Sequence, residues 1–147
     1  MCNPRGHWVA IPPDARRYFE ASNYRTTRVR FVSGHLSATF ESGGFFLLSG
    51  AAEMTETRGT SRGDFTSIIE YQGSRYRIRS GHLRATVNST VRVDGMTITD
   101  AHGNVTHPTI PEFTGDGTVD WPIVCTSRQL QLTVTVGGSP LTLVFHH

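Results

Sequence analysis

The side chains best suited to chemistry in this sequence are basic groups on one face of two predicted hairpins: Arg28, Arg30, Arg75, Arg77, Arg79, Arg84 and His82. Side chains two residues apart in a strand share a face, and a two-residue loop with glycine is typical of a β-hairpin. If Ser80-Gly81 forms such a loop, Arg77 lies directly across from Arg84. Like charges that face each other across a strand pair destabilise it unless a counter-charge relieves them. We therefore expect this face to meet an anion.

An anionic polymer, a glycan or an acidic protein surface would each supply that counter-charge. The chain has no lysine, so all 14 of its Lys and Arg residues are Arg. The guanidinium group of Arg pairs well with phosphate and carboxylate, because it donates two parallel hydrogen bonds. The alternative is a solvated sheet face in a lysine-free protein whose net charge is only +2. We expect no stacking aromatic side chains among these arginines, which argues against single-stranded nucleic acid as the partner.

The seven histidines show none of the spacings typical of metal sites. His35 and His82 stand at the same place in two copies of a repeat, and the third copy has Gln129 there. That substitution indicates a polar role beside a turn rather than a metal ligand. The alternative place for a metal is a predicted loop with three possible ligands: Asp100, His102 and His107. We predict neither a metal site nor a cofactor.

The two cysteines, Cys2 and Cys125, are too few for the disulfide framework of a small secreted domain. Cys125 takes the position of Phe31 and Ile78 in the other copies, so we expect it to be buried as a small apolar side chain. Cys2 as an N-terminal nucleophile would resemble one hydrolase superfamily, but those enzymes are layered α/β proteins with long helices. We recognise no catalytic motif and predict that the protein is not an enzyme.

Arg62-Gly63-Asp64 is a tripeptide that can bind integrins from an exposed loop. It falls in a segment that we expect to be a loop after the first repeat unit. Short motifs recur often by chance, and no other feature of the sequence indicates a host-cell ligand. Integrin binding is therefore a hypothesis that depends on this tripeptide lying in a loop.

The elements that must position these side chains repeat at an interval of 47 residues. Residues 30–39 and 77–86 agree at seven of ten positions, and residues 124–133 keep the Ser, the Leu and the last Thr. A period of about 20 to 50 residues is typical of repeated supersecondary units. In each copy, apolar and polar residues alternate on both sides of a predicted turn. These turns are Ser33-Gly34, Ser80-Gly81 and Ser127-Arg128.

A second predicted turn follows each hairpin, so each unit is a three-stranded meander. These turns are Ser49-Gly50, Asp94-Gly95 and Gly137-Gly138. A lead segment adds one strand to each unit, with candidates at residues 8–11, 65–71 and 118–121. The total of twelve strands in three units resembles the β-trefoil, in which six strands close a barrel and three hairpins cap it. The units are residues 1–54, 55–99 and 100–147. A β-sandwich or jelly roll of the same short strands is the alternative.

At 147 residues, the chain is expected to be one all-β domain, residues 1–147, that buries a core without metals or disulfides. The one predicted helix spans Asp14 to Ala21, directly after Pro13, which suits a first helical position. We recognise no signal peptide and no membrane-spanning stretch, so we expect synthesis in the cytoplasm. We predict a non-catalytic binding module. The alternative is a structural subunit of a homo-oligomeric shell, virion or filament.

Overall fold

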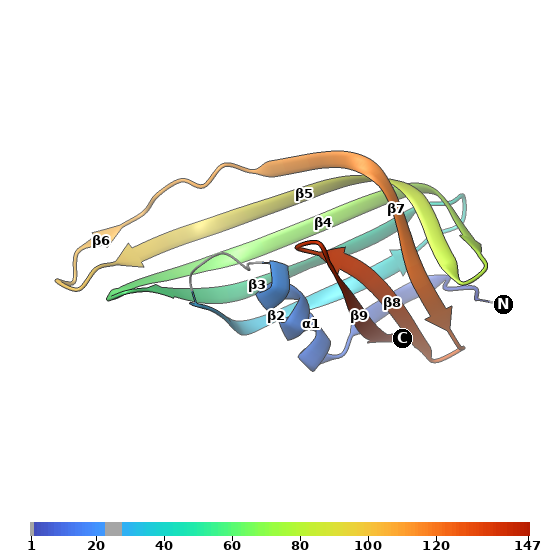
Figure 1. The fold of residues 1–147 in the computed structure, drawn as a ribbon, viewed down its shortest axis with the longest axis horizontal. Helices are drawn as coiled ribbons and strands as arrows, with labels where there is room; N and C mark the ends of the chain where they lie inside the picture. The colour runs from blue at the N-terminus through green and yellow to red at the C-terminus, as the bar shows by residue number, and fades with distance from the viewer. Residues whose placement is uncertain (1, 23–27) are drawn as a thin grey trace.

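The computed structural model describes residues 2–22 and 28–147, which form a nine-stranded antiparallel sheet and one helix (Figure 1). The strands are β1 (Gly6–Ala10), β2 (Arg28–Phe40), β3 (Phe46–Arg58), β4 (Ser61–Arg79), β5 (His82–Thr99), β6 (Val105–Thr106), β7 (Phe113–Cys125), β8 (Gln129–Val136) and β9 (Ser139–His146), and the helix is α1 (Pro12–Ser22). Because β1 pairs with β9, eight strands close into a barrel. The remaining strand, β6, pairs only with the end of β5.

The all-β prediction is confirmed, and the architecture is a single closed barrel. Its strands follow one another around the barrel in chain order, as in a meander. The threefold trefoil arrangement is not confirmed, because the described residues form nine strands of one sheet rather than twelve strands with three capping hairpins. A sandwich is not formed either, since the sheet closes on itself instead of packing against a second sheet.

The barrel interior is filled by the side chains that the alternating pattern predicted to be apolar and inward. Leu36, Leu83 and Leu130, which are equivalent in the three sequence copies, each have 0% of their surface exposed. Burying a leucine side chain contributes about 1.5 to 3 kcal/mol. Other inward positions of the three sequence copies are also buried: Ala38, Ala85, Ile123 and Leu132.

Both turns predicted in the first sequence copy are wrong, because their glycines lie inside the long strands β2 and β3. A Cβ atom on Gly50 would lie 2.3 Å from the carbonyl oxygen of His35, and one on Gly34 would lie 2.4 Å from that of Ala51. Glycine thus allows the paired backbones of β2 and β3 to approach closely at these positions. The same Cβ on Gly50 would lie 3.2 Å from the ring of Phe19 in α1, so this glycine also makes room for the helix.

Of the remaining four predicted turns, one is wrong and three are confirmed. Asp94-Gly95 lies inside β5, at a β-bulge where the register with β4 shifts. Ser80-Gly81, Ser127-Arg128 and Gly137-Gly138 are confirmed, since each lies in the short loop between two paired strands. Ser80 and Gly81 have φ angles of 54° and 73°, and positive φ at both central residues defines a type I′ turn.

The predicted helix is confirmed, and α1 packs one apolar face against the barrel. That face holds residues three and four positions apart, which share one side of a helix: Ala15, Tyr18 and Phe19. Burial, and secondly the neighbouring Tyr71 hydroxyl, raises the pKa of Tyr18 well above its usual value. Across residues 2–22 and 28–147, no helix has the length and apolar character to cross a membrane.

Asp14 joins the first turn of α1 to the last strand of the barrel. Its Oδ2 accepts a hydrogen bond of 2.7 Å from the backbone N–H of Val144 in β9. Its Oδ1 accepts one of 2.9 Å from Arg17, one turn further along the helix. Ile11 donates its backbone N–H to the carbonyl of the same Val144, so the chain continues the pairing of β1 with β9 as it enters the helix.

Cys2 and Cys125 form a disulfide, and Cys125 is only partly buried, which corrects the expectations of a domain without disulfides and of a buried apolar Cys125. Their Cα atoms lie 5.2 Å apart, within the range that disulfides require. The prediction failed because cysteine number was compared with the frameworks of small secreted domains, whereas this is a single bond across 123 residues. Since the Cys2 sulfur is bonded to Cys125, it is not free to act as the nucleophile of a hydrolase.

Candidate anion-binding site

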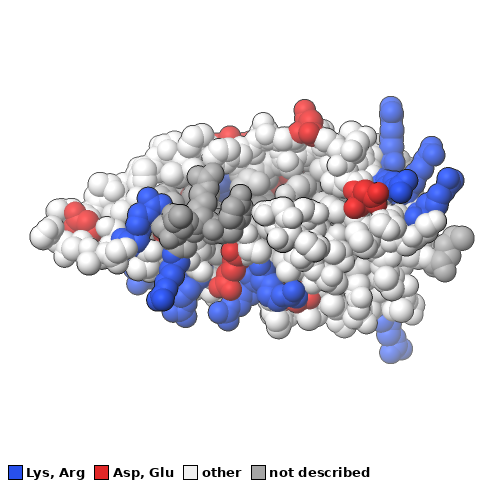
Figure 2. Space-filling view, viewed as in Figure 1, with Lys and Arg blue, Asp and Glu red and all other residues white. Residues whose placement is uncertain are grey.

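Three arginines of β4 point outward close to the β4–β5 hairpin, and we call Arg75, Arg77 and Arg79 the arginine row. They line a surface pocket of about 570 Å³ whose other walls come from β5 and β7. The polar side chains of those walls are Arg84, Thr86, Thr118 and Asp120. Figure 2 shows basic side chains projecting from the end of the molecule where this hairpin lies.

The predicted pairing across the hairpin is confirmed by the register. Arg77 lies opposite Arg84, and Arg79 lies opposite His82. Both pairs lie on the outer face because the residues between them, Ile78 and Leu83, turn inward toward the core. The hairpin therefore sets cations side by side on two strands.

A β-bulge brings Arg75 onto the same face. Between the pairs Ser74–Thr86 and Arg77–Arg84, two residues of β4 oppose one residue of β5. The extra residue, Arg75, has a φ of 55°, a left-handed conformation that non-glycine residues rarely adopt. If regular alternation ran through Arg75 without a bulge, Arg77 and Arg79 would turn toward the core with the buried odd-numbered residues of β4, such as Ile69 and Gly73, and their charges could not be solvated there.

Asp120 of β7 supplies the counter-charge for β5 but not for the arginine row. One of its carboxylate oxygens lies 3.2 Å from Arg84 Nε, and the other lies 2.7 Å from His82 Nδ1. Within residues 2–22 and 28–147, no carboxylate lies within ion-pair distance of Arg75, Arg77 or Arg79. Three guanidinium groups therefore remain without an acidic partner in the described protein.

Arg28 and Arg30 were predicted to share this face, but the structure places them elsewhere. They pair with Thr57 and Thr55 near the end of β3, whereas the arginine row lies beside its beginning. Their outward orientation follows the predicted alternation, yet the long strands separate them from the hairpin. The structure thus brings together five of the seven predicted residues.

Two residues near the site were missed from the sequence. Asp120 was not predicted as a site residue, because its contact depends on the pairing of β5 with β7, which no local pattern predicts. Phe45 has 56% of its surface exposed, in the loop between β2 and β3. A signal for it existed: two consecutive phenylalanines entering a strand cannot both face the core, and Phe46 is the buried one.

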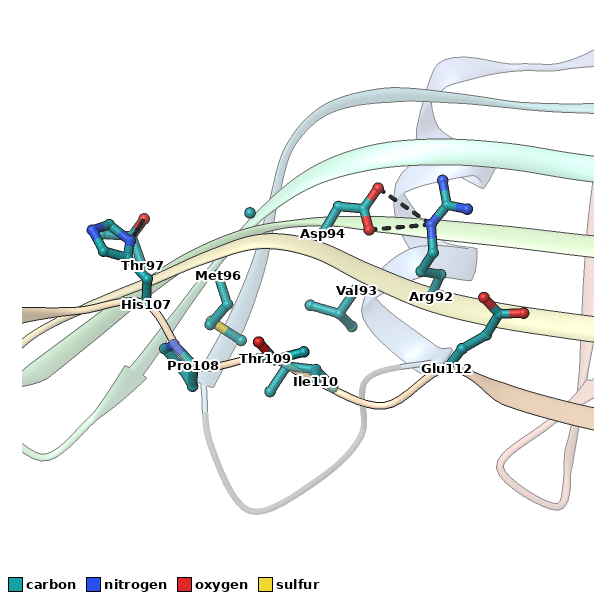
Figure 3. A pocket seen from close by; sticks show the side chains of 11 residues that line it. Arg92, Val93, Asp94, Met96, Thr97, His107, Pro108, Thr109, Ile110 and Glu112 are labelled. Carbon is teal, nitrogen blue, oxygen red and sulfur yellow. Dashed lines mark hydrogen bonds and ion pairs between the residues drawn. The ribbon is translucent and has the colours of Figure 1, made fainter.

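A second pocket, of about 470 Å³, lies at the other end of β5 (Figure 3). Its charged side chains are largely satisfied within the protein, since Arg92 Nε lies 3.1 Å from Asp94. His107 Nδ1 lies 3.3 Å from the hydroxyl of Thr97. This pocket therefore presents fewer free charges than the one at the arginine row.

The loop considered for a metal is held together by its own backbone. Asp100 accepts hydrogen bonds from the backbone N–H groups of Asn104 and His102, and these bonds lower the pKa of its carboxyl group. In the part of the chain that the structure describes, no group of three or more His, Cys, Asp or Glu side chains is placed to hold a metal ion.

The loop expected for Arg62-Gly63-Asp64 is wrong, because these residues lie in β4. Gly63 pairs with Glu56 of β3 on one side and with Ile98 of β5 on the other. Arg62 Nη2 lies 3.1 Å from Asp64 Oδ1, so the two charged groups bind each other. The integrin hypothesis loses the exposed loop on which it depended.

Comparison with known proteins finds no matching family model, no similar curated protein and no similar solved structure. The functional interpretation therefore comes from the geometry of the site. Guanidinium groups in a shallow pocket, with threonine hydroxyls beside them, can donate hydrogen bonds to the oxygens of a phosphate, sulfate or carboxylate group.

Proposed function

We propose that this protein is a non-catalytic binding module that holds an anionic partner on the arginine row. The observation that carries the proposal is the lack of any acidic partner, among the described residues, for three neighbouring arginines. Their mutual repulsion destabilises the free protein, and a bound anion relieves it. The pocket between β4, β5 and β7 gives that anion a place to lie.

The neighbouring pair of Arg84 and Asp120 helps to define where the anion binds. Because Asp120 already neutralises Arg84 and contacts His82, the positive potential of the site is concentrated on β4. The site is exposed, so salt screens it over roughly 8 Å at physiological ionic strength. Binding is expected to weaken as salt is added.

Retention on a heparin column at low salt tests the proposal. Arg77→Glu and Arg84→Glu should elute at clearly lower salt than the wild type, because each puts a negative charge into the site. Arg28→Glu is the matched control, since it makes the same charge change at the far end of the barrel strands and should cost much less retention. Equal loss for all three variants, or no retention of the wild type, would contradict the proposal.

A structural subunit of a homo-oligomer is the second candidate, and one feature of β5 favours it. Between Val91, which pairs with Phe113, and Ile98, which pairs with Thr106, no described strand covers that edge of β5. Phe113 is 54% exposed beside this stretch. Open edges pair readily with other chains. Light scattering measures the molar mass of the protein in solution. A defined oligomer would support this candidate, and a monomer would rule it out.

A further inference from the structure

Resting on the proposed function, we infer that the anionic partner is a single-stranded nucleic acid. Its phosphates bind along the arginine row, and one base stacks on Phe45. Two properties of the site carry this inference: the spacing of the cations and the position of an exposed aromatic ring.

The spacing of the row fits a chain of regularly repeated anions. Alternate residues of a strand are about 6.8 Å apart, so Arg77 and Arg79 present cations at that interval. Successive phosphates of an extended single strand lie at a similar separation, since each nucleotide spans roughly twice the 3.4 Å rise of a stacked strand. Arg75 continues the row toward the loop between β2 and β3.

Phe45 lies at the Arg75 end of the row. The carbonyl oxygen of Gly44 accepts a 3.0 Å hydrogen bond from the backbone N–H of Tyr76, which holds the loop against β4. Phe46 pairs with Gly73 and is buried, so the preceding Phe45 turns outward on the face that bears the row. An exposed aromatic ring beside a basic track is the usual surface of single-strand-binding proteins.

This position changes the interpretation made from the sequence alone. The lack of a stacking aromatic side chain among the arginines argued against single-stranded nucleic acid, and Tyr76, between Arg75 and Arg77, packs inward against Phe40 and Phe46. The barrel supplies the ring from the loop that precedes β3, and β3 pairs with β4. A sulfated glycan would use the arginines without needing a base, so it is a separate outcome of the test.

Fluorescence anisotropy with two labelled oligonucleotides of equal length provides that test, using the full chain at low salt. One is a thymidine 12-mer and the other has the same phosphates without bases. Phe45→Ala should weaken binding of the thymidine 12-mer about fivefold or more and leave the abasic strand unchanged. Phe113→Ala is the matched control, because this residue is 54% exposed, close to the 56% of Phe45, but pairs with Val91, far along β5 from the row.

The arginine row is tested in the same assay. Arg77→Glu should weaken both oligonucleotides, and three phosphate contacts correspond to a slope of about −2 for log K against log salt. If Arg77→Glu weakens both but Phe45→Ala weakens neither, the inference is overturned while the proposed function stands. Binding of heparin without binding of either oligonucleotide likewise overturns the inference and leaves the proposed function standing. If Arg77→Glu changes no binding at all, both fail.

Discussion

At the scale of single residues, the site combines charge with backbone strain. Arg75 is one of two described non-glycine residues with positive φ, and the other, Ser80, belongs to the hairpin turn directly beyond the row. A left-handed conformation costs a residue with a Cβ atom roughly 1 to 2 kcal/mol. Such outliers persist when the surrounding structure holds them in place, and they cluster at functional sites.

Arg75→Gly separates the strain from the charge. Glycine adopts a φ of 55° without a Cβ clash, so the free energy of unfolding should stay equal to the wild type or rise by up to about 1 kcal/mol. Binding should weaken because one cation is lost. Urea unfolding measures the first effect and heparin retention the second.

Arg77→Gly is the control for that experiment, because Arg77 lies in the same strand without positive φ. The free energy of unfolding of Arg77→Gly should be lower than that of the wild type by about 0.5 to 1 kcal/mol, the usual cost of glycine in a strand. If Arg75→Gly destabilises the protein as much as Arg77→Gly, Arg75 is not strained.

The pairing of Arg77 with Arg84 was predictable from the sequence, since it follows from the hairpin turn and the alternation of side chains. The contacts of Asp120 were not predictable, because they depend on the pairing of β5 with β7. In that pairing Asp120 lies opposite Arg84, which is 36 positions earlier in the chain. The local sequence pattern thus predicted the basic side chains. The carboxylate of Asp120 beside them could be identified only from the three-dimensional structure.

At the scale of the elements, glycine inside a strand has a different role from glycine in a turn. In β2 and β3 it lets two backbones come together where α1 packs against them. A Ser-Gly pair between alternating runs looks the same in both cases. That is why Ser80-Gly81 was predicted correctly as a turn and Ser33-Gly34 and Ser49-Gly50 were not.

Gly50→Ala should therefore destabilise the barrel by about 1 to 3 kcal/mol, because its Cβ would lie 2.3 Å from the carbonyl oxygen of His35. The matched change is Gly117→Ala in β7, where an added Cβ meets nothing within 4 Å. That variant should be neutral or slightly more stable. Thermal or urea unfolding of both variants measures these changes in stability. An equal loss of stability in the two variants would argue against close packing at Gly50.

At the scale of the whole molecule, a covalent bond and a strand pairing both connect distant parts of the chain. The Cys2–Cys125 disulfide spans 123 residues, and β1 pairs with β9 at residues Val9 and His146. The all-β class was predictable from alternation summed over the chain. The closure was not, because nothing in either strand's own sequence identifies its partner.

Removing the disulfide should lower stability substantially. Closing a loop of this length stabilises a protein by about 4 to 5 kcal/mol in the chain-entropy account. The double variant Cys2→Ser with Cys125→Ser should therefore unfold at lower temperature than the wild type, and a reducing agent should shift only the wild type. An identical melting temperature in the presence and absence of reductant would contradict this expectation.

The pairing of β1 with β9 also has a consequence for biosynthesis. Because β1 emerges from the ribosome first and needs β9 as its second neighbour, the cylinder cannot close while the chain is still being translated through β8. Until then the nascent sheet has two open edges, at β1 and at its newest strand, which can pair with other nascent chains. Long-range closure of this kind is slow. Chaperones that shield open strands are expected to raise the yield of this protein during expression.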